Sequence, residues 1–489
     1  MKNMKYISYT IAFIFIVHCT VINENCFTQW GPDLRLTNAS GSSNTTHNHA
    51  WSVASNGNVV HALFYDDRDG NQEIYYKRSI NAGTTWGTDT RLTNNSASSL
   101  MPSISIVDNL VHAVWHDNRD GNWEVYYKRS TDMGITWGMD TRITNNSATN
   151  WHPSIAVFGS NVHIVWRDNR DGNQEIYYKN STDGGVTWGA DVRLTINSSF
   201  SWMANIAVYN SVVHIVWQDN RDGNYEIYYK RSPDGGLSWG VDTRMTNNSA
   251  ISEVPSISVS NQNVHIVWGD QRDGNKEIYY KRSPDGGISW GPDVRVTSNS
   301  AISDYPCIAV YNSILHIVWH DNRDGNTEIY YKLSMDGGLN WGTDTRITNN
   351  PSSSEYASVS IAGYNLHIVW QDNRDGNYEI YYKRDPTGNP TSISVINTEI
   401  PKYFSLSQNY PNPFNPMTNI EFSTGKYSHI RITVSDLLGR ETEKLVDLNL
   451  NPGVYNAVFE GRNYPSGIYF YTMYIDGIKF DTKKMMVLK

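Results

Sequence analysis

One short pattern recurs through most of the chain and limits the folds that the chain can adopt. The pattern is Asp-x-Arg-Asp-Gly-Asn-x-Glu, and successive copies begin 51 residues apart with no insertion or deletion. Its seven copies begin at Asp66, Asp117, Asp168, Asp219, Asp270, Asp321 and Asp372. A repeat of this length is one supersecondary unit that buries its apolar surface by stacking on its neighbours. The seven repeats must therefore form one assembly.

Each repeat contains four segments typical of β-strands. In the third repeat these segments are residues 153–158, 162–167, 174–180 and 188–195, each rich in β-branched or aromatic residues and bounded by Gly, Asn, Asp or Ser. No segment shows convincing helical periodicity. Four antiparallel strands per repeat, arranged around an axis, predict an all-β fold, namely a β-propeller.

The two ends of the repeat region predict a closed ring. The outermost strand has the pattern Trp-Gly-x-Asp-x-Arg, which follows the first six repeats but is missing after the seventh. A further copy stands before the first repeat, at residues 30–35. This N-terminal strand would complete the last blade and remove the exposed sheet edges. Residues 30–386 number 357, or seven times 51, so we expect a seven-bladed propeller over this range.

The N-terminus and the overall composition point to an exported protein. Lys2 and Lys5 precede a short uncharged apolar segment, which predicts a signal peptide at residues 1–26. The chain has only three cysteines, so the fold is not built on disulfides, and we interpret Cys307 as a buried filler. The net charge of −9 argues against a nucleic-acid-binding surface, which needs a basic patch.

The connection between the third and fourth strands has its own signature. Ser181–Trp188 reads Ser-Thr-Asp-Gly-Gly-Val-Thr-Trp, and similar sequences occupy this place in five other repeats. The Asp accepts backbone N–H bonds, the Gly residues adopt positive φ, and we expect the Trp to pack between sheets. This sequence resembles the Asp-box of sialidases and related propellers. The resemblance implies a hairpin and not an activity, because the Asp-box is a structural turn in that family.

A second domain follows the propeller. After a linker at residues 387–403, short strand-like segments at 418–423, 429–435, 454–460, 467–475 and 478–488 alternate with turn signals. This pattern predicts a small Ig-like β-sandwich at residues 404–489.

The second domain also carries ordered motifs. Among them are Tyr-Pro-Asn-Pro-Phe-Asn-Pro at 410–416, Ser-Asp-Leu-Leu-Gly-Arg at 435–440 and a Lys-rich terminus at 483–489. These motifs resemble the C-terminal sorting domain of type IX secretion substrates. The resemblance implies recognition by that secretion machinery, passage across the outer membrane, and removal of this domain. We therefore expect a protein that is secreted or held at the cell surface. We also expect the protein to be a monomer.

The Asp-x-Arg-Asp-Gly-Asn element suggests two interpretations. Asp117, Asp120, Asn122 and Glu124 offer the oxygen ligands that Ca²⁺ prefers. Arg119 stands among them, however, and a fixed cation repels a divalent ion. A tight hairpin turn explains every residue, so we favour a structural role and expect no cofactor, with calcium as the alternative. We interpret the seven mid-strand histidines as structural for the same reason, since a metal site needs no seven equivalents.

Positions that differ between repeats are better candidates for function than positions that are the same in every blade. Four positions that flank the loops of one face combine aromatic and polar side chains, which suits the apolar faces and hydroxyl groups of sugars. Plain surface variation is the alternative. The candidate ligand-binding residues are Trp151, His152, Trp202, His116, Arg167, Trp123, Tyr225, Glu253, Asp304 and Glu355.

Three functions remain open. We favour a non-catalytic propeller that recognises glycan or protein ligands. The competing hypothesis is an exo-sialidase-like glycoside hydrolase, because the resemblance implies three carboxylate-binding arginines, a Tyr–Glu nucleophile pair and an Asp acid. Three observations argue against it. Most arginines recur in every repeat, and Arg167 is the clear exception near this face. The Arg-Ile-Pro motif found near the start of sialidase propellers is absent, and typical sialidase rings have six blades and not seven. The third possibility is a structural surface protein with no discrete ligand.

Overall fold

The computed structural model describes residues 30–46, 51–363, 365–385, 394–397, 401–426, 428–450, 452–461 and 464–488. These residues form strands and turns, and none of them lies in a helix. Accordingly, the described part of the chain has no helix suited to crossing a membrane. The chain divides into two compact units, of which one is Trp30–Asn389 and the other includes Pro390–Lys489. The predicted signal peptide, residues 1–26, lies outside the described residues.

The third repeat shows how one blade is built. β11 (Asn150–Phe158), β12 (Asn161–Asp168), β13 (Glu175–Ser181) and β14 (Val192–Arg193) pair antiparallel in this order. The fourth strand is much shorter than the predicted 188–195. Single backbone bonds from Gly189 to Asn180 (2.9 Å) and from Leu194 to Ile176 (2.8 Å) hold its flanks against β13 without a continuous ladder.

The described residues of Trp30–Asn389 form seven such sheets, here called blades one to seven in the order of the repeats. Blade three is β11–β14. Blade one has β2 (Ser43–Asn44), β3 (Val53–Asn56), β4 (Val59–Asp66), β5 (Glu73–Ser79) and β6 (Thr90–Arg91), and blade two has β7 (Ser99–Val107), β8 (Leu110–Asp117), β9 (Glu124–Ser130) and β10 (Thr141–Arg142). Blade four has β15 (Ser201–Tyr209), β16 (Val212–Asp219), β17 (Glu226–Ser232) and β18 (Thr243–Arg244), and blade five has β19 (Ser252–Ser260), β20 (Asn263–Asp270), β21 (Glu277–Ser283) and β22 (Val294–Arg295). Blade six has β23 (Ser303–Tyr311), β24 (Ile314–Asp321), β25 (Glu328–Ser334) and β26 (Thr345–Arg346), and blade seven has β27 (Ser354–Ala362), β28 (Asn365–Asp372), β29 (Glu379–Asp385) and β1 (Leu34–Arg35).

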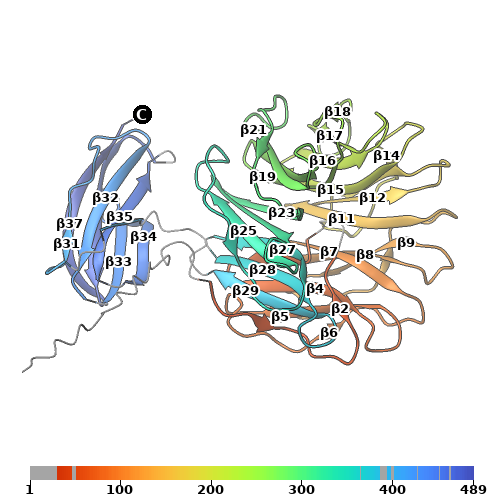
Figure 1. Cartoon of the computed structure of the whole chain (residues 1–489), viewed down its shortest axis with the longest axis horizontal. Helices are drawn as coiled ribbons and strands as arrows, with labels where there is room; N and C mark the ends of the chain where they lie inside the picture. Colours follow the sequence, from red (N-terminus) through yellow and green to blue (C-terminus); the bar gives the residue numbers. More distant parts are fainter. Residues whose placement is uncertain are drawn as a thin grey trace, which may run out of the picture. The chain divides into compact units, whose positions relative to one another are not determined.

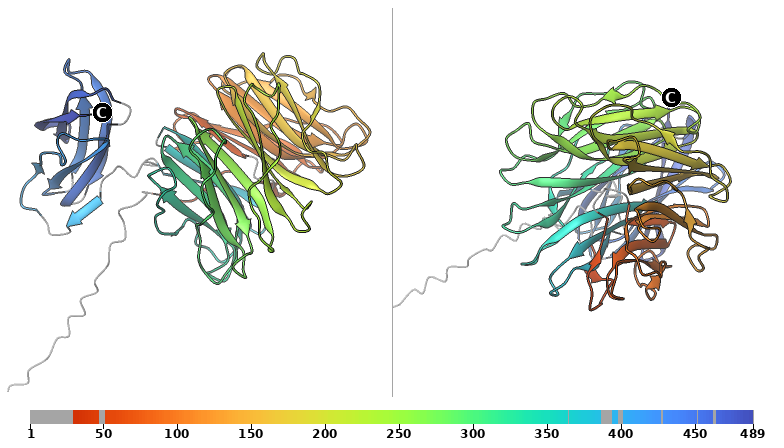
Figure 2. Two further views of the ribbon diagram at one scale, coloured as in Figure 1. Left: turned by 90° about the horizontal axis from the view of Figure 1, so that it is seen from above. Right: turned by 90° about the vertical axis from the view of Figure 1, so that its right-hand side faces the viewer.

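The blades form a closed ring, which makes this unit a β-propeller (Figure 1). The innermost strands touch in a circle from β3 through β7, β11, β15, β19, β23 and β27 back to β3. β1 completes blade seven, as predicted, by pairing with β29. Asp33 strengthens this closure through ion pairs with Arg374 and Lys383, each at 2.8 Å. Figure 2 shows the same sheets from two further directions.

Apolar side chains fill the spaces between neighbouring blades. In blade three, Trp166 is completely buried and shares one core cluster with Val114 and Tyr127 of blade two. A tryptophan occupies the equivalent place in blades two to seven, and Phe64 occupies it in blade one. Burial of large aromatic side chains at each interface stabilises the ring by holding every blade against the next.

The Asp-box has the predicted turn geometry. Asp183 accepts hydrogen bonds from the backbone N–H groups of Val186 (3.0 Å) and Thr187 (2.9 Å). Gly185 has a φ of +82° and lies so close to Tyr127 that a Cβ atom would be 2.0 Å from the tyrosine oxygen. Trp188 packs edge-on against Tyr127 of the preceding blade, with ring centroids 4.9 Å apart. The Asp-box therefore joins two blades, which confirms its structural role.

The Asp-x-Arg-Asp-Gly-Asn element is also held by its own contacts. Arg119 donates to Asp117 from Nε (2.9 Å) and Nη2 (2.5 Å), and to Asp140 from Nη1 (2.7 Å). Its guanidinium group lies 4.3 Å from the centre of the Tyr126 ring. Asn122 donates to the backbone oxygen of Ala148 at 2.6 Å and so fixes the loop that leads to the next blade.

The seven mid-strand histidines each bond to a tyrosine of the same blade. In blade two, His112 Nδ1 lies 2.7 Å from Tyr127 Oη, and the other six pairs are at 2.6 to 2.8 Å. Burial, assisted by the charge of Arg129, lowers the pKa of His112 to about 3. These histidines therefore remain neutral in the folded protein, which agrees with the structural role expected for them.

The C-terminal unit is a sandwich of two antiparallel sheets. One sheet has the order β30-β35-β32-β31 and the other β34-β33-β36-β37. The strands are β30 (Ser394–Asn397), β31 (Ser405–Leu406), β32 (Met417–Thr424), β33 (Ser428–Ser435), β34 (Glu441–Leu450), β35 (Gly453–Glu460), β36 (Gly467–Ile475) and β37 (Ile478–Val487).

Two of these strands correct the sequence analysis. β30 falls within the predicted linker, 387–403, yet it pairs with β35 and so belongs to the sandwich. β34 was not predicted, because its charged first half, Glu-Thr-Glu-Lys, resembles a loop. Its pairing with β33 and the burial of Leu445 and Val446 make it a strand all the same.

Candidate functional site

The four variable positions of each repeat lie at one end of the blade. In blade three, Trp151 is paired with Arg167 across β11 and β12, and Arg167 is paired with Ile176 across β12 and β13. The turn that carries Asp-x-Arg-Asp-Gly-Asn joins β12 to β13 at this same end. We call this end of the propeller the loop face. The inner rim is the set of variable positions there, at the starts of the innermost strands, at the ends of the second strands and just before the third strands.

A backbone irregularity is repeated along the inner rim. The register of β11 and β12 shifts between Trp151 and Ser154, and His152, which lies in this shift, has a φ of +54°. Left-handed backbone is uncommon for residues other than glycine and persists where the surroundings impose it. The same conformation, with φ from +51° to +58°, is found at Met101, His152, Met203, Val254, Tyr305 and Tyr356. The blade thus fixes the backbone here and leaves the side chain free to vary.

Four side chains of blades three and four form what we call the tryptophan–arginine cluster: Trp151, His152, Arg167 and Trp202. The guanidinium carbon of Arg167 lies 4.2 Å from the ring centre of Trp151 and 4.7 Å from that of Trp202. His152 is stacked on Trp202, with the planes 8° apart, and its Nδ1 accepts a hydrogen bond from Trp202 Nε1 at 3.2 Å. Trp151 and Trp202 are both partly exposed.

Further candidates extend this cluster to the neighbouring blades. His116 accepts a hydrogen bond from the backbone N–H of His152 at 3.3 Å and packs edge-on against Trp123, with ring centroids 4.9 Å apart. Burial, together with the charge of Arg167, lowers the pKa of His116 to about 3. Tyr225 of blade four is close enough to both Arg167 and Glu253 for their charges to act on its pKa, which burial raises.

The carboxylates of blades five to seven form a second group, which we call the acidic cluster: Glu253, Lys276, Asp304, Glu355 and Tyr378. Lys276 Nζ lies 2.6 Å from Glu253 and 2.7 Å from Asp304. Tyr378 donates to Glu355 at 3.3 Å. Burial raises the pKa of Asp304 against the opposing effect of Lys276, and burial also raises the pKa of Glu355.

Three aromatic residues of the inner rim accompany the acidic cluster. Tyr305 and Tyr356 pack edge-on with ring centroids 4.8 Å apart, and His320 lies 4.9 Å from Tyr305 and 5.5 Å from Tyr356. Burial and the nearby Asp304 raise the pKa of Tyr305 to about 12. These three residues, with Lys276 and Tyr378, were not among the predicted site residues. Variation between repeats, which identified the other candidates, could also have identified these five residues, because all five stand at variable positions.

The structure thus sorts the ten predicted residues into two groups of unlike charge. Trp151, His152, Trp202, His116, Arg167, Trp123 and Tyr225 come from blades two to four, and Glu253, Asp304 and Glu355 come from blades five to seven. Not all of them are at the surface. Arg167 and His116 are each 4% exposed, and Asp304 is 6% exposed.

The arginine arrangement of a sialidase is not present in the described residues. Arg167 is the one arginine of the inner rim there, and Arg170 and its equivalents in the adjacent turns are engaged by aspartates of their own blades. Glu253 is bonded to Lys276 rather than to Tyr225. The described residues also contain no group of three or more His, Cys, Asp or Glu side chains arranged to hold a metal ion.

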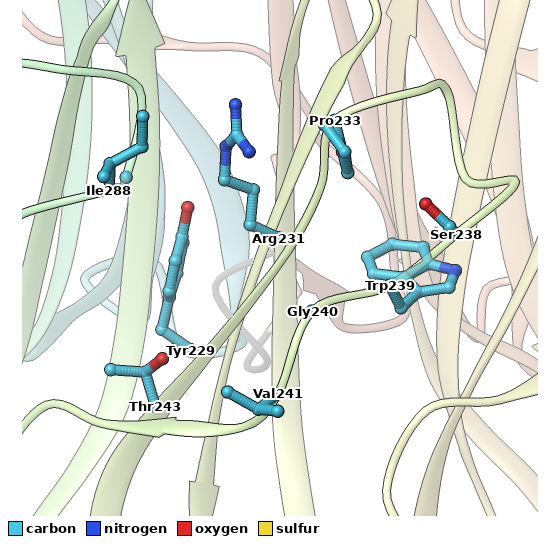
Figure 3. A pocket seen from close by; sticks show the side chains of 10 residues that line it. Tyr229, Arg231, Pro233, Ser238, Trp239, Gly240, Val241, Thr243 and Ile288 are labelled. Carbon is cyan, nitrogen blue, oxygen red and sulfur yellow. The ribbon is translucent and has the colours of Figure 1, made fainter.

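A separate hollow of about 380 Å³ lies at the Asp-box end, between blades four and five (Figure 3). Trp239 and Tyr229 line it, together with Val241 and Ile288, which are 85% and 73% exposed. Arg231 also lines it and donates to the backbone oxygen of Gly286 at 2.7 Å. The hollow is a seam between blades and contains none of the predicted site residues.

The comparisons with known proteins agree with both parts of the fold. Residues 20–221 match the BNR repeat-like domain, and residues 408–488 match the secretion system C-terminal sorting domain. The chain carries a BNR repeat-like domain and a secretion sorting domain. Because the sorting domain is of the type IX kind, the protein is secreted or held at the cell surface and interacts with the secretion machinery. None of the curated proteins matches the chain.

Solved structures resemble the BNR repeat-like propeller at low sequence identity. The crystal structure of polysaccharide lyase Uly1 matches with a TM-score of 0.53 and 9% identity, covering 74% of this chain and 100% of that one. Trypanosoma rangeli sialidase matches with a TM-score of 0.43 and 14% identity, covering 80% and 86%. Penicillium chrysogenum α-L-arabinanase complexed with arabinobiose matches with a TM-score of 0.42 and 15% identity, covering 60% and 94%. The likeness to the polysaccharide lyase concerns the fold alone.

Proposed function

We propose that this secreted propeller is a non-catalytic glycan-binding protein and that the inner rim of its loop face is the binding site. The observation that carries the proposal is the tryptophan–arginine cluster, in which Trp151 and Trp202 flank Arg167 and remain partly exposed. Partly exposed tryptophans in adjacent blades provide apolar surface of the kind on which sugar rings stack.

The remaining variable residues supply the polar contacts that a sugar needs. Carboxylates, phenols and amides such as Glu253, Tyr225 and Gln174 can accept or donate hydrogen bonds to hydroxyl groups. Pairing an apolar surface with a few placed polar groups is the usual composition of a small-molecule site. We propose that the protein acts as a monomer, because the ring is closed within one chain and β1 completes blade seven.

The ion pairs of Lys276 favour binding over catalysis. A glycoside hydrolase uses two carboxyl groups, one as a proton donor and one as a nucleophile or base. Lys276 forms ion pairs with both Glu253 and Asp304, so neither carboxyl group stands without a charged partner.

A glycoside hydrolase of sialidase-like type is the second candidate. It is favoured by the position of Tyr225 near Arg167 and Glu253 and by the burial that raises the pKa of Asp304. If the second candidate holds, a fluorogenic sialoside will be turned over by the wild-type protein.

The proposal is tested on a glycan array with the wild-type protein and the double variant Trp151→Ala/Trp202→Ala. We expect the wild type to bind a subset of glycans and the double variant to lose about tenfold in affinity, since aromatic packing contributes on the order of 0.5–1.5 kcal/mol per ring. The matched control is Val241→Ala/Ile288→Ala, which removes exposed apolar side chains from the Asp-box end. Equal binding by the wild type and the tryptophan variant would refute the proposed site.

A further inference from the structure

Arg167 differs from the arginines of the neighbouring turns in having no acidic partner. Arg170, three residues along the chain, is bonded to Asp168 and Asp191, and although burial opposes its charge, these bonds raise its pKa. Arg167 forms no ion pair with any described residue, and its one hydrogen bond goes from Nη1 to Gln174 Oε1 at 3.2 Å. Its positive charge is therefore buried without a neighbouring carboxylate.

The physical consequence is a cation that favours an anion. Burial lowers the pKa of Arg167 to about 10, because the surroundings do not compensate its charge. The indole rings of Trp151 and Trp202 attract the guanidinium group through their electron-rich faces, but they carry no net charge. Arg167 keeps 4% of its surface exposed, and Nε and Nη2, along one edge of the guanidinium group, donate no hydrogen bond to a described residue. A carboxylate or a sulfate fits such an edge through two parallel hydrogen bonds.

The acidic cluster has the opposite preference. It sets three carboxylates, those of Glu253, Asp304 and Glu355, against the single ammonium group of Lys276. An anionic group is repelled here, whereas the hydroxyl groups of a sugar can donate hydrogen bonds to carboxylate oxygens.

The order of the blades brings the two groups close at one end, where Tyr225 of blade four lies near both Arg167 and Glu253, and separates them at the other. The blades follow one another in chain order, so blade seven, which carries Glu355 and Tyr378, lies across the ring from the boundary between blades three and four. That boundary carries the tryptophan–arginine cluster. A ligand that satisfies both groups must extend along or across the inner rim.

Building on the proposed glycan-binding function, we infer that the inner rim binds an extended anionic glycan chain, with a carboxylate or sulfate group at Arg167 and hydroxyl groups at the acidic cluster. Such a site recognises units within a chain. It differs in this respect from a site that encloses one terminal sugar.

The first test uses three polymers with the same backbone: dextran, carboxymethyl-dextran and dextran sulfate. We expect the full chain to bind at least one of the anionic polymers about tenfold or more tightly than dextran, because hydrogen bonds between charged groups are the strong ones. Arg167→Gln should remove this preference. The matched control is Arg440→Gln, which removes an exposed arginine, 75% accessible, from the other unit. Measurement at about 0.5 M salt suppresses attraction between exposed charges.

The second test addresses the length of the ligand. Dextran oligosaccharides of increasing length, each oxidised at one end to carry a single carboxylate, should bind the wild-type protein more tightly until their neutral units reach the acidic cluster, after which the affinity should level off. Glu355→Gln should weaken binding of the long oligomers and leave binding of the shortest ones unchanged. Thermal unfolding of each variant shows whether it is folded, and Arg167→Lys, which keeps the charge but loses the two-pronged geometry, should bind with intermediate affinity.

The outcomes distinguish this inference from the proposed function. Preference for either anionic polymer supports the inference, and the polymer preferred identifies the anionic group. Equal affinity for dextran and both anionic polymers overturns the inference while leaving glycan binding intact. Equal loss of dextran and anionic binding in Arg167→Gln also overturns it, since the arginine would then act only by positioning the tryptophans. Binding of no glycan, or of a protein alone, overturns the proposed function and the inference together.

Discussion

The buried histidines should make the propeller unfold in mild acid. Eight histidines have their pKa lowered to about 3 or 4, with burial as the first cause, and they are His61, His112, His116, His163, His214, His265, His316 and His367. In an unfolded chain each of them binds a proton near pH 6.5. The unfolded state therefore binds more protons than the folded state as the pH falls below 6.5, and the free energy of unfolding decreases.

The size of this effect follows from the pKa difference. At pH 5.5, one histidine that binds its proton only when unfolded lowers the free energy of unfolding by about 1.4 kcal/mol. Eight such groups lower it by on the order of 10 kcal/mol, which is comparable with the whole stability of a typical domain. The carboxylates cause little of the change in this range, because unfolded Asp and Glu titrate near pH 4.

Proton uptake on unfolding measures the number of these histidines directly. We expect the full chain, unfolded by guanidinium chloride in weakly buffered solution at pH 5.5, to take up about seven protons, since a group with pKa 6.5 is about nine-tenths protonated there. His112→Gln, which removes one buried histidine, should reduce the uptake by about one proton. An uptake of only one or two protons would mean that the histidines are protonated in the folded state, and the argument from burial would be wrong.

Two further predictions concern the joints between blades. Gly236→Ala should destabilise the protein more than Gly235→Ala. Both glycines have positive φ, but only at Gly236 would a Cβ atom lie 2.0 Å from the oxygen of Tyr178. The difference between the urea midpoints of the two variants therefore measures the effect of this clash. Arg282→Leu should lower the free energy of unfolding by about 1 kcal/mol, since it removes the 2.8 Å hydrogen bond from Arg282 to the backbone oxygen of Gly337 in the next Asp-box. Leu333→Arg places an arginine at the equivalent position of blade six and should not raise the free energy of unfolding, because the seventh repeat lacks the Asp-box sequence that would accept its hydrogen bond. Equal effects within either pair would contradict the proposed contacts.

Most of the fold could be predicted because the same strand and turn signals occur in all seven repeats. A single strand signal is ambiguous, but the same four signals at 51-residue intervals leave few alternatives. The closure by β1 was visible as a missing outer strand at one end and an extra one at the other. The boundary strand β30 was missed because a single copy of a short segment lacks this confirmation, and its pairing with β35 is a long-range contact.

The site could be predicted only in part. Variation between repeats identified the positions, and the fold of the blade placed them at one end. The partners could not be deduced, because they depend on which side chains meet across blades. The stacking of His152 on Trp202 joins residues from different repeats, and so does the pairing of Lys276 with Asp304. The near-complete burial of Arg167 likewise depends on neighbours that its own repeat does not specify.

The repeat also explains why function must be sought at the inner rim. Charged and polar side chains that are the same in all seven blades make structural contacts, as the pairs of Arg119 with Asp117 and of His112 with Tyr127 show. A change of such a residue in one blade removes a contact that holds that blade together. At the position of His152 the blade fixes the backbone through the bulge but makes no such demand on the side chain. A ring built this way can acquire a new ligand when side chains of the inner rim change, because the backbone of the blades stays the same. In this protein those side chains divide the charge between blades two to four, which carry Arg167, and blades five to seven, which carry the acidic cluster.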